Sequence, residues 1–338
     1  MVKVSVILTT YNGENTLRRA VDSWLAQTLA DCEIVITDDC SKDDTRSIIA
    51  EYAKQYPERI VANYMEHNTR NSGAINYGVE TAHGKYVIIV DQDDWADKTM
   101  LEKLYNVAER ENAEIADCNC AVIDSAGNLL EIQKSYTPDQ IGDITVEKRK
   151  SLLVYPGWRF TKIIRKDFLV KNNLEHCRNT CFGDSYIMEF IAAYCTKIAK
   201  VDEPLYFYYI DTSVSQTMNN PIIYDRVKSA ELMIEGMKER GFLELYREEI
   251  EFRFIELFYA NSISAFLQRF RPCELNEIRY LRNTVKQKYS NYRKNKYFKE
   301  NLSKKKKVLT LLCDICPTLL CKTYPLYAEF KKIFQRNR

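Results

Sequence analysis

The sequence predicts an α/β protein whose central sheet is mostly parallel and flanked by helices, followed by a C-terminal helical region. Three observations support this prediction. The first 120 residues alternate short apolar runs with segments long enough for helices, as βαβ units do. From residue 221 to residue 289, apolar side chains recur at helical spacing and no strand-like run competes. A chain of 338 residues, 46% of them hydrophobic, can bury a core of this size.

The first 120 residues contain five strand-like runs, each followed by a polar segment. The expected strands are Lys3–Thr9, Glu33–Asp38, Ile60–Met65, Tyr86–Val90 and Ile115–Cys120. In parallel sheets, ligands bind beyond the carboxyl ends of the strands. The residues that directly follow these runs are therefore the first candidates for a functional site.

The rest of the chain has a mixed and then a helical pattern. We expect a helix to begin near Asp184 and a strand over Leu205–Ile210. The pattern divides the chain into an α/β domain over 1–215, with halves 1–120 and 121–215, a helical appendage over 216–300 and a basic, amphipathic tail over 301–338.

Charge is unevenly distributed, although the whole chain carries only +2. Between residues 279 and 338, 17 Lys and Arg face three acidic residues, a local net charge of +14, which leaves −12 for the first 278 residues. A basic tail of this kind approaches anionic lipid or nucleic acid. Its apolar stretches can lie on a membrane but are too short to span one. Because the start lacks a signal peptide, we expect a cytoplasmic protein, peripheral on the inner face of the cell membrane.

The first polar strand end reads Thr9-Thr10-Tyr11-Asn12-Gly13-Glu14. A chain that leaves a strand here turns into a helix, so that backbone N–H groups and an aromatic ring can meet a nucleotide. An ordinary strand-to-helix cap would use the same residue types and is the alternative explanation.

The second strand end carries two adjacent carboxylates, Asp38 and Asp39, ahead of Ser41 and Asp43. Carboxylates at this point can accept hydrogen bonds from an imide N–H or a ribose hydroxyl, as uridine recognition requires. Helix capping would explain Ser41 and Asp43, but it does not require the preceding pair of aspartates.

The third strand end is the most acidic, with Asp91-Gln92-Asp93-Asp94 directly after an apolar run. Clustered carboxylates repel and raise one another's pKa unless a cation is present. Oxygen ligands of this kind suit Mg²⁺ or Mn²⁺, and a divalent ion that bridges to a diphosphate would neutralise the charge of the leaving group. A solvated acidic turn is the alternative.

The runs VSVILTTYN, EIVITDDCSKDDT and HGKYVIIVDQDDW, in this order and at these separations, resemble the nucleotide-sugar-binding half of family 2 glycosyltransferases with a GT-A fold. The resemblance covers roughly residues 2–215 and implies a Rossmann-like fold with a nucleotide-sugar-binding half over 1–120 and an acceptor half over 121–215. It also implies that Thr9 and Tyr11 contact the uracil–ribose end of the donor.

For the other matching positions the resemblance implies the following roles. Glu14 braces the first loop and Asp39 reaches the base. Asp91 faces the ribose, with Gln92 beside it in the nucleotide-sugar site. The metal is implied to lie on Asp93, and Asp91 and Asp94 could share it.

Between Asn68 and Gly78 the chain departs from the common family pattern. Arg70 and Ile75 replace the usual glycine and arginine, as in a subset of the family whose pattern reads TR-x4-IN. Arg70 therefore becomes the candidate for a uracil or diphosphate contact, since a guanidinium offers several donors in one plane. A surface arginine in a polar loop is the alternative.

A transferase of this type also needs a base for the acceptor hydroxyl. Family members usually carry an Asp, often preceded by Glu, that opens a helix about 90 residues after the metal motif. Here Asp184 lies 91 residues beyond Asp93 and a helical pattern follows, while Gly183 replaces the Glu. A carboxylate in this place can accept the proton as the hydroxyl attacks in line. A role for Asp184 in helix capping alone is the alternative.

Two further segments fall where the family has acceptor and donor loops. Trp158 and Arg159 lie in the acceptor-loop segment, where an exposed Trp could stack on a sugar face or instead fill the core. Asp211–Gln216 resembles the serine-containing loop that covers the nucleotide sugar, and a plain linker is the alternative.

These roles predict an inverting glycosyltransferase that moves a sugar from a UDP-sugar to a hydroxyl of a glycan acceptor, lipid-linked, in bacterial surface-polysaccharide synthesis, with Mg²⁺ or Mn²⁺ as cofactor. A nucleotidyltransferase of related α/β architecture is the alternative, although the glycine-rich loop with a basic residue typical of that class is missing after the first strand. We expect no nucleic-acid partner, because the strand-bearing half is acidic. The donor sugar and the acceptor stay open.

Overall fold

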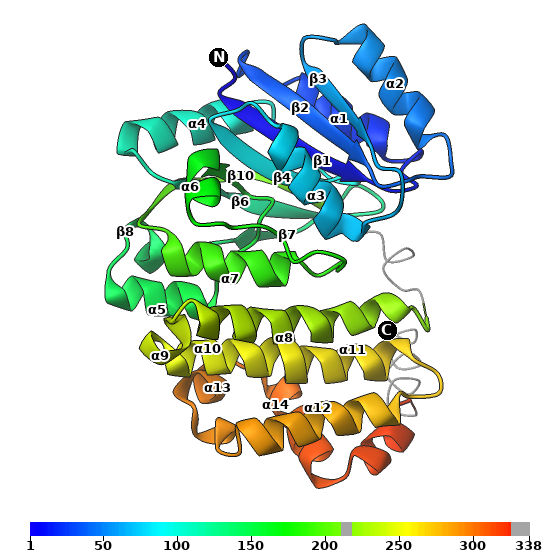
Figure 1. Cartoon of the computed structure of the whole chain (residues 1–338), viewed down its shortest axis with the longest axis vertical. Coiled ribbons are helices and arrows are strands. Elements are labelled where there is room, and N and C mark those ends of the chain that lie inside the picture. The colour runs from blue at the N-terminus through cyan, green and yellow to red at the C-terminus, as the bar shows by residue number, and fades with distance from the viewer. Residues whose placement is uncertain (211–217, 326–338) are drawn as a thin grey trace. The chain divides into compact units, whose positions relative to one another are not determined.

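The structure, a computed structural model, describes residues 1–210 and 218–325, and the chain divides into two compact units, Met1–Thr212 and Ser213–Arg338. The N-terminal unit holds every strand of the described residues (Figure 1). Its elements are β1 (Val4–Thr10), α1 (Leu17–Leu25), β2 (Cys32–Asp38), α2 (Thr45–Gln55), β3 (Ile60–Tyr64), α3 (Arg70–Thr81), β4 (Tyr86–Asp91), β5 (Trp95–Ala96), α4 (Met100–Glu111), β6 (Ile115–Asp124), β7 (Leu129–Lys134), η1 (Pro138–Gln140), β8 (Gly142–Asp143), α5 (Val146–Val154), β9 (Lys162–Arg165), α6 (Lys166–Lys171), α7 (Asp184–Tyr194) and β10 (Lys197–Ile210).

The ten strands form one sheet in the order β3-β2-β1-β4-β9-β6-β10-β5, with β7 paired to β6 and β8 to β10. The run from β3 to β4 is parallel, as is the β6–β10 pair. This confirms the predicted α/β class with parallel strands at its centre. The short strand β9 lies antiparallel between β4 and β6 and makes the sheet mixed. The sequence did not predict β9, because four residues are too few to show a periodic pattern of apolar side chains.

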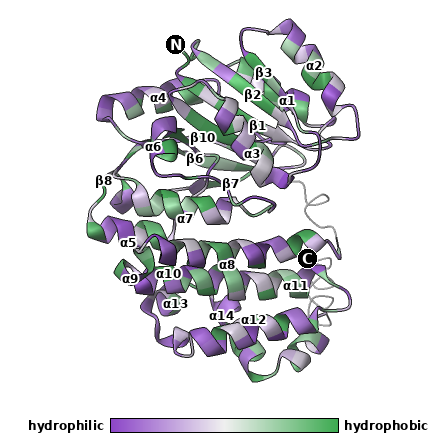
Figure 2. Cartoon of the chain, in the orientation of Figure 1, coloured by the Kyte–Doolittle hydropathy of each residue, from purple (hydrophilic) through white to green (hydrophobic). Residues whose placement is uncertain are grey.

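Helices cover both faces of the sheet, which explains why the central strands are continuous apolar runs (Figure 2). Val4, Val6 and Leu8 of β1 share a buried core with residues of α1 and α4. On the opposite face Ile7 packs under α3, so closely that a Cβ added to Gly78 would lie 2.7 Å from it. The polar residues that follow the apolar runs of β1, β2 and β4 lie at the ends of these strands.

The register brings those strand ends together. In the sheet Thr9 pairs with Thr37 of β2 on one side and with Asp91 of β4 on the other. The three polar strand ends found in the sequence therefore lie at one edge of the sheet, where open α/β sheets bind ligands.

The C-terminal unit is helical in its described residues, as the apolar period predicted. α10, η4 and α11 follow one another without a break, and η4 is a π-helical stretch whose Phe258 and Tyr259 are fully buried. No helix in residues 1–210 and 218–325 combines the length and the apolarity needed to cross a membrane. The elements are η3 (Pro221–Ile223), α8 (Tyr224–Glu239), α9 (Phe242–Leu245), α10 (Arg247–Phe254), η4 (Ile255–Asn261), α11 (Ser262–Arg269), α12 (Leu275–Lys288), η5 (Tyr292–Lys294), α13 (Lys296–Glu300) and α14 (Lys304–Ile315).

Candidate active site

The loop after β1 is tied to the acidic loop after β4 by one side chain, Gln92. Its Oε1 accepts hydrogen bonds from Thr10 Oγ1 at 2.5 Å and from the backbone N–H of Tyr11 at 3.0 Å. The Tyr11 ring stays exposed at the rim. Thr9 is buried, and its hydroxyl donates to Asn71 Oδ1 at 2.7 Å, which joins β1 to the first turn of α3.

Glu14 lies between the loops that follow β1 and β2. Its Oε2 accepts from the backbone N–H of Asp44 at 3.2 Å, and its own N–H donates to Asp43 Oδ2 at 3.1 Å. These two contacts join the loops beside the start of α2. The contacts of Tyr11, Thr9 and Glu14 with a nucleotide stay predictions.

The two aspartates after β2 have different surroundings. Asp38 is fully buried and pairs with Arg46 at 2.6 Å, which makes it part of the scaffold. Asp39 accepts from both the N–H and the hydroxyl of Thr69, at 2.6 and 2.8 Å, and burial raises its pKa. It thereby fixes the residue that precedes α3.

Arg70 is the first residue of α3 and has a left-handed backbone conformation, with φ of 63°. Its guanidinium reaches toward the segment before α7, where Nη1 lies 3.9 Å from Cys181 Sγ. The side chain thus lies between the start of α3 and the residues that lead to Asp184. Its contact with uracil or diphosphate stays a prediction.

Asp91, at the end of β4, pairs with a buried arginine. Arg159 is 7% exposed, and its Nη2 donates to Asp91 Oδ1 at 2.5 Å while Nη1 donates to the carbonyl of Ile89 at 3.2 Å. The sequence placed Arg159 in an acceptor loop, whereas the structure buries it beneath the acidic strand end. The neighbouring Trp158 is half-buried and stacks on Phe160.

Asp93 has the properties expected of a ligand for a cation. Burial, together with the charge of Asp91, raises its pKa to about 6. Its backbone carbonyl accepts from Arg19 Nη2 at 2.5 Å, and the Arg19 guanidinium lies 4.3 Å from the ring centre of Trp95 and 4.5 Å from that of Tyr209. Sequence reasoning missed Arg19, because an arginine within a helix carries no motif.

Asp94 faces into the protein. It is 1% exposed, and its two oxygens accept from the hydroxyl of Tyr206 at 2.7 Å and from the N–H of Tyr209 at 2.8 Å. Burial and the neighbouring aspartates raise its pKa well above the ordinary value. Asp94 therefore anchors the acidic loop to β10, and a share in metal binding stays a prediction.

The acidic strand end suits a divalent ion held mainly by a substrate. Among the described residues, no three His, Cys, Asp or Glu side chains converge into a complete metal cage. Mg²⁺ in proteins commonly takes one or two carboxylates and completes its shell with phosphates and water. Asp93, whose charge interacts with that of Asp91, would supply one or two carboxylates of this kind together with it.

Asp184 is exposed and opens α7, as the sequence predicted. The N-cap position is held by Gly183, so Asp184 does not cap the helix with its side chain. A Cβ on Gly183 would lie 2.1 Å from Ser72 Oγ. A glutamate at position 183 therefore has no room, because Ser72 of α3 approaches too closely.

Helix α3 also holds the residues that lead to Asp184. The Asn76 side chain exchanges two hydrogen bonds of 2.9 Å with the backbone N–H and carbonyl of His176. Ser72 N–H donates to the carbonyl of Thr180 at 3.4 Å, and their hydroxyls lie 3.3 Å apart. A cavity of about 150 Å³ beside this clamp is lined by Asn71, Ser72, Ile75, Arg159, His176, Cys181, Phe182, Gly183 and Asp184. The predicted loop Asp211–Gln216 lies outside the described residues.

The chain resembles known proteins in sequence and in fold. Residues 5–182 match the family model for "Glycosyl transferase family 2". A cholesterol galactosyltransferase of Borreliella burgdorferi is 33% identical over 61% of this chain and 59% of its own length, and an uncharacterized glycosyltransferase of Escherichia coli, YibD, is 30% identical over 63% of each. The chain thus spans less than two thirds of these two relatives. The crystal structure of S. aureus TarS 1-349 in complex with UDP-GlcNAc has a TM-score of 0.65 at 18% identity, over 96% of this chain and 92% of that one. At this identity the likeness shows the fold alone.

Proposed function

The chain belongs to glycosyltransferase family 2, and from that premise we propose that it transfers a sugar from a UDP-sugar to a hydroxyl of a glycan acceptor with inversion. Membership decides against the nucleotidyltransferase alternative. One observation carries the proposal: buried Arg159 binds Asp91 at the acidic strand end and also lines the cavity that contains Asp184. A direct displacement needs acidic groups for the metal and for the base, and Arg159 lies next to both the acidic strand end and the cavity lined by Asp184.

The donor would lie along the edge formed by β1, β2 and β4. Thr9, Tyr11, Glu14, Asp39, Arg70, Asp91 and Gln92 are the residues we assign to it. Exposed Tyr11 would lie against the base, and the guanidinium of Arg70 suits the diphosphate. A UDP-sugar is supported by the carboxylate acceptors after β2 and by the UDP-GlcNAc complex of the structural neighbour TarS.

We assign the divalent ion to Asp93, with Asp91 beside it. When bound, Mg²⁺ or Mn²⁺ would neutralise the charge that develops on the departing diphosphate. Arg159 fixes Asp91, and Asp94 anchors the loop through β10, so the acidic loop is held in place before any ligand arrives. Arg19 adds a third fixed point through the carbonyl of Asp93.

Asp184 would act as the general base. It is exposed, it opens a helix that α3 clamps in place, and its carboxylate can accept the proton of an attacking hydroxyl. Arg159, whose charge interacts with that of Asp184, lines the same cavity. Attack opposite the leaving diphosphate inverts the anomeric carbon.

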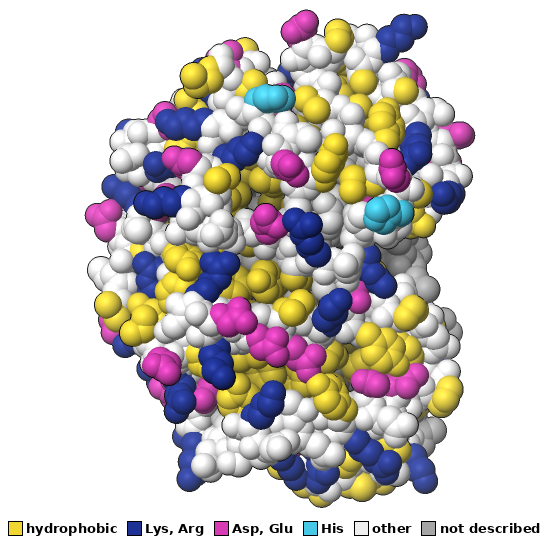
Figure 3. Space-filling view, viewed as in Figure 1, with side chains coloured by type: hydrophobic (Ala, Val, Ile, Leu, Met, Phe, Trp, Pro, Cys, Tyr) yellow, Lys and Arg dark blue, Asp and Glu magenta, His cyan; other side chains and the backbone are white. Residues whose placement is uncertain are grey.

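For the acceptor we propose a lipid-linked glycan of bacterial surface-polysaccharide synthesis, reached from an anionic membrane surface. Among the apolar residues of the tail, Leu309 and Leu320 are buried within the C-terminal unit. Five other apolar residues of α14 and of the segment after it are 44 to 69% exposed, and we call them the apolar stripe: Val308, Leu311, Leu312, Ile315 and Leu319. Figure 3 shows Lys and Arg side chains over the C-terminal helices beside hydrophobic ones. An apolar stripe beside basic residues suits an anionic lipid interface.

A panel of nucleotide sugars tests the transferase. We expect release of UDP from one UDP-sugar in the presence of Mn²⁺, loss of activity with a chelator, and loss in Asp93→Ala with the fold retained. Asp143→Ala, at an exposed aspartate of β8, is the matched control and should keep full activity. Turnover that persists in the chelator would remove the metal from the proposal, and a retained anomer in the product would contradict direct displacement.

Flotation with vesicles tests the membrane surface separately. Full-length protein should float with anionic vesicles at low salt and lose that binding at high salt. Leu311→Ser with Ile315→Ser should abolish flotation without loss of fold, because both side chains are exposed. A variant that floats as well as wild type would rule out this stripe.

A further inference from the structure

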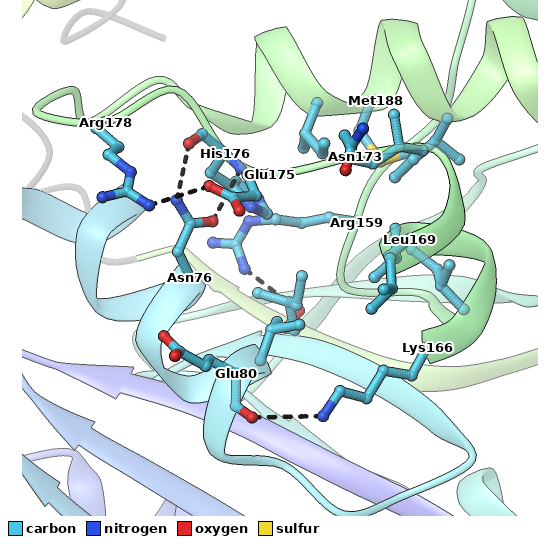
Figure 4. Close-up of a pocket in the computed structure, with 17 residues that line it drawn as sticks. Asn76, Glu80, Arg159, Lys166, Leu169, Asn173, Glu175, His176, Arg178 and Met188 are labelled. Carbon is cyan, nitrogen blue, oxygen red and sulfur yellow. Dashed lines mark hydrogen bonds and ion pairs between the residues drawn. The ribbon is translucent and has the colours of Figure 1, made fainter.

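The N-terminal unit contains a second, larger cavity, to which no step of the proposed transfer has been assigned. It measures about 400 Å³ and lies between α3, α6 and α7, over the ends of β4 and β9 (Figure 4). That volume falls within the range of small-molecule sites. Its floor is apolar and consists of Val79, Ile89, Ile164, Leu169, Val170, Leu174, Ile187, Met188 and Ile191.

The three basic side chains that line this cavity, Arg159, Lys166 and Arg178, all have partners within the protein. Arg178 pairs with Glu175 at 3.2 Å, and Lys166 Nζ donates to the carbonyls of Ala82 at 2.5 Å and Glu80 at 3.5 Å. Arg159, the third base of the lining, pairs with Asp91 at 2.5 Å, and the second acid beside Glu175 is Glu80. An anion such as a phosphate would therefore meet no basic group that lacks a partner among the described residues of this lining.

One polar atom in the wall of this cavity lacks a partner. His176 is 4% exposed, and no hydrogen bond reaches its Nε2 from the described residues. Burial and the charge of Arg159 lower its pKa to about 3, so the ring is neutral at physiological pH. A neutral ring nitrogen serves as one donor or one acceptor. A buried polar atom that lacks a partner in its own protein is well placed to receive one from a ligand.

We propose that this cavity binds a neutral amphiphile, an apolar chain or ring system that carries one hydroxyl or carbonyl group, with that group hydrogen-bonded to His176 Nε2. The apolar floor would take the hydrocarbon, and a charged analogue would bind more weakly because its charge would lie against apolar side chains. Binding itself does not depend on the proposed function, but its consequence for turnover does.

The consequence follows from two shared residues. Arg159 and His176 line both this cavity and the cavity beside Asp184. A bound molecule would therefore contact Arg159, which pairs with Asp91. It would also contact His176, in the segment that α3 holds and that leads to Asp184. It would be either the apolar part of the acceptor or a separate lipid that regulates turnover, and both have the same chemistry.

Methyl NMR of the full-length protein labelled at methionine tests binding directly, with octan-1-ol, octanoate and octylamine as probes. We expect a saturable shift of the Met188 methyl with octan-1-ol and none for Met233 and Met237, which are buried in α8 of the other unit. The two charged probes should bind at least about tenfold more weakly, since burying an unpaired charge is unfavourable. The absence of saturation, or equal binding of all three probes, would overturn the proposal.

Two variants locate the site. His176→Phe keeps the apolar wall and should weaken octan-1-ol about tenfold, the size expected for one hydrogen bond. Val79→Trp, at a half-buried residue of the lining, should block the cavity even if the histidine variant fails to fold. Val146→Trp, an exposed valine outside the cavity, is the control and should bind like wild type. Unchanged binding in Val79→Trp would place the probe elsewhere and contradict the assignment.

Kinetics with saturating octan-1-ol separate the two sources of the ligand. A higher KM for a lipid-linked acceptor would identify the cavity as the place of the acceptor's apolar part. A changed kcat with a water-soluble acceptor would identify a separate effector. Binding without either effect would disprove the coupling to the active site, while failure of every UDP-sugar to react would concern the proposed function alone.

Discussion

The acidic strand end of the N-terminal unit and the Asp314 cluster of the C-terminal unit are both built from carboxylates and tyrosines, yet their charges are balanced differently. Asp314 accepts from the hydroxyls of Tyr259 and Tyr292, at 2.6 and 2.8 Å, and pairs with Arg293 at 2.8 Å. Asp314 thus has one positively charged partner and two neutral hydrogen-bond donors. This is the usual arrangement of a structural acid.

At the end of β4 three carboxylates share one bonded guanidinium. Arg159 pairs with Asp91, Asp94 takes neutral donors, and the pKa of Asp93 is raised to about 6. The excess negative charge is unfavourable in the empty protein and becomes favourable when a cation binds. From this comparison we propose that Asp93, which has a raised pKa and no paired cation among the described residues, belongs to the functional site, and that Asp314, which has one, belongs to the scaffold.

The largest effect is expected at Asp184, an exposed acid at the start of α7. Asp184→Asn should lower kcat by about 10²–10⁴-fold with donor affinity nearly unchanged, because a general base contributes this much. Steady-state kinetics measure the loss. Asp167→Asn, at an exposed aspartate on α6, should have no effect. A loss in Asp184→Asn below about threefold would remove this residue from the mechanism.

A smaller loss of kcat is expected at Asn76, whose side chain holds the segment that leads to Asp184. Asn76→Ala removes both hydrogen bonds to His176 and should lower kcat about tenfold with an unchanged KM for the donor. The KM–kcat split distinguishes positioning from a general loss of folded protein, which thermal unfolding would report. Equal kcat in Asn76→Ala would show that Asp184 does not depend on α3.

Asp314, which pairs with Arg293, should contribute to the stability of the fold and not to the transfer reaction. Asp314→Asn should lower the free energy of unfolding by about 1–3 kcal/mol, since Arg293 loses its charged partner. Chemical denaturation followed by circular dichroism measures this change. Donor hydrolysis by the remaining folded protein should be unchanged, and its selective loss would break the distinction between the two acidic centres.

The smallest effect concerns the pH dependence that Asp93 introduces. Its folded-state pKa of about 6 lies above the ordinary value of 3.8, so the protonated acid favours the folded protein. This stabilising contribution is complete below about pH 4 and is lost as the pH rises through 6. A bound cation needs the ionised acid, so the increase in Tm given by Mn²⁺ with UDP should grow between pH 5 and pH 7.

Replacement of the acid sharpens this test. Asp93→Asn should raise the Tm of the metal-free protein at pH 7.5 by about 2–4 °C, which corresponds to about 1 kcal/mol, and should abolish the pH-dependent response to Mn²⁺. A lower Tm would show that Asp93 is a structural acid like Asp314.

The sequence by itself determined the elements that depend on local patterns. Apolar runs predicted β1, β2 and β4 to within one or two residues, because strands buried on both faces leave an uninterrupted pattern. The first residue of α7 was predicted from the motif spacing and the helical period. Which acids follow the strands was also readable, since the chain order and the parallel topology place those ends at one edge.

Only the tertiary structure decided which acid has which partner. Arg159 reaches Asp91 across 68 residues, Tyr206 reaches Asp94 across 112, and Asn76 reaches the backbone of His176 across 100. No periodic pattern encodes such pairs, because they arise when β9 inserts beside β4, β10 folds back along β6, and α3 approaches the start of α7. The sequence therefore shows that the site is acidic, and the packing of distant segments decides which acids keep their charge uncompensated.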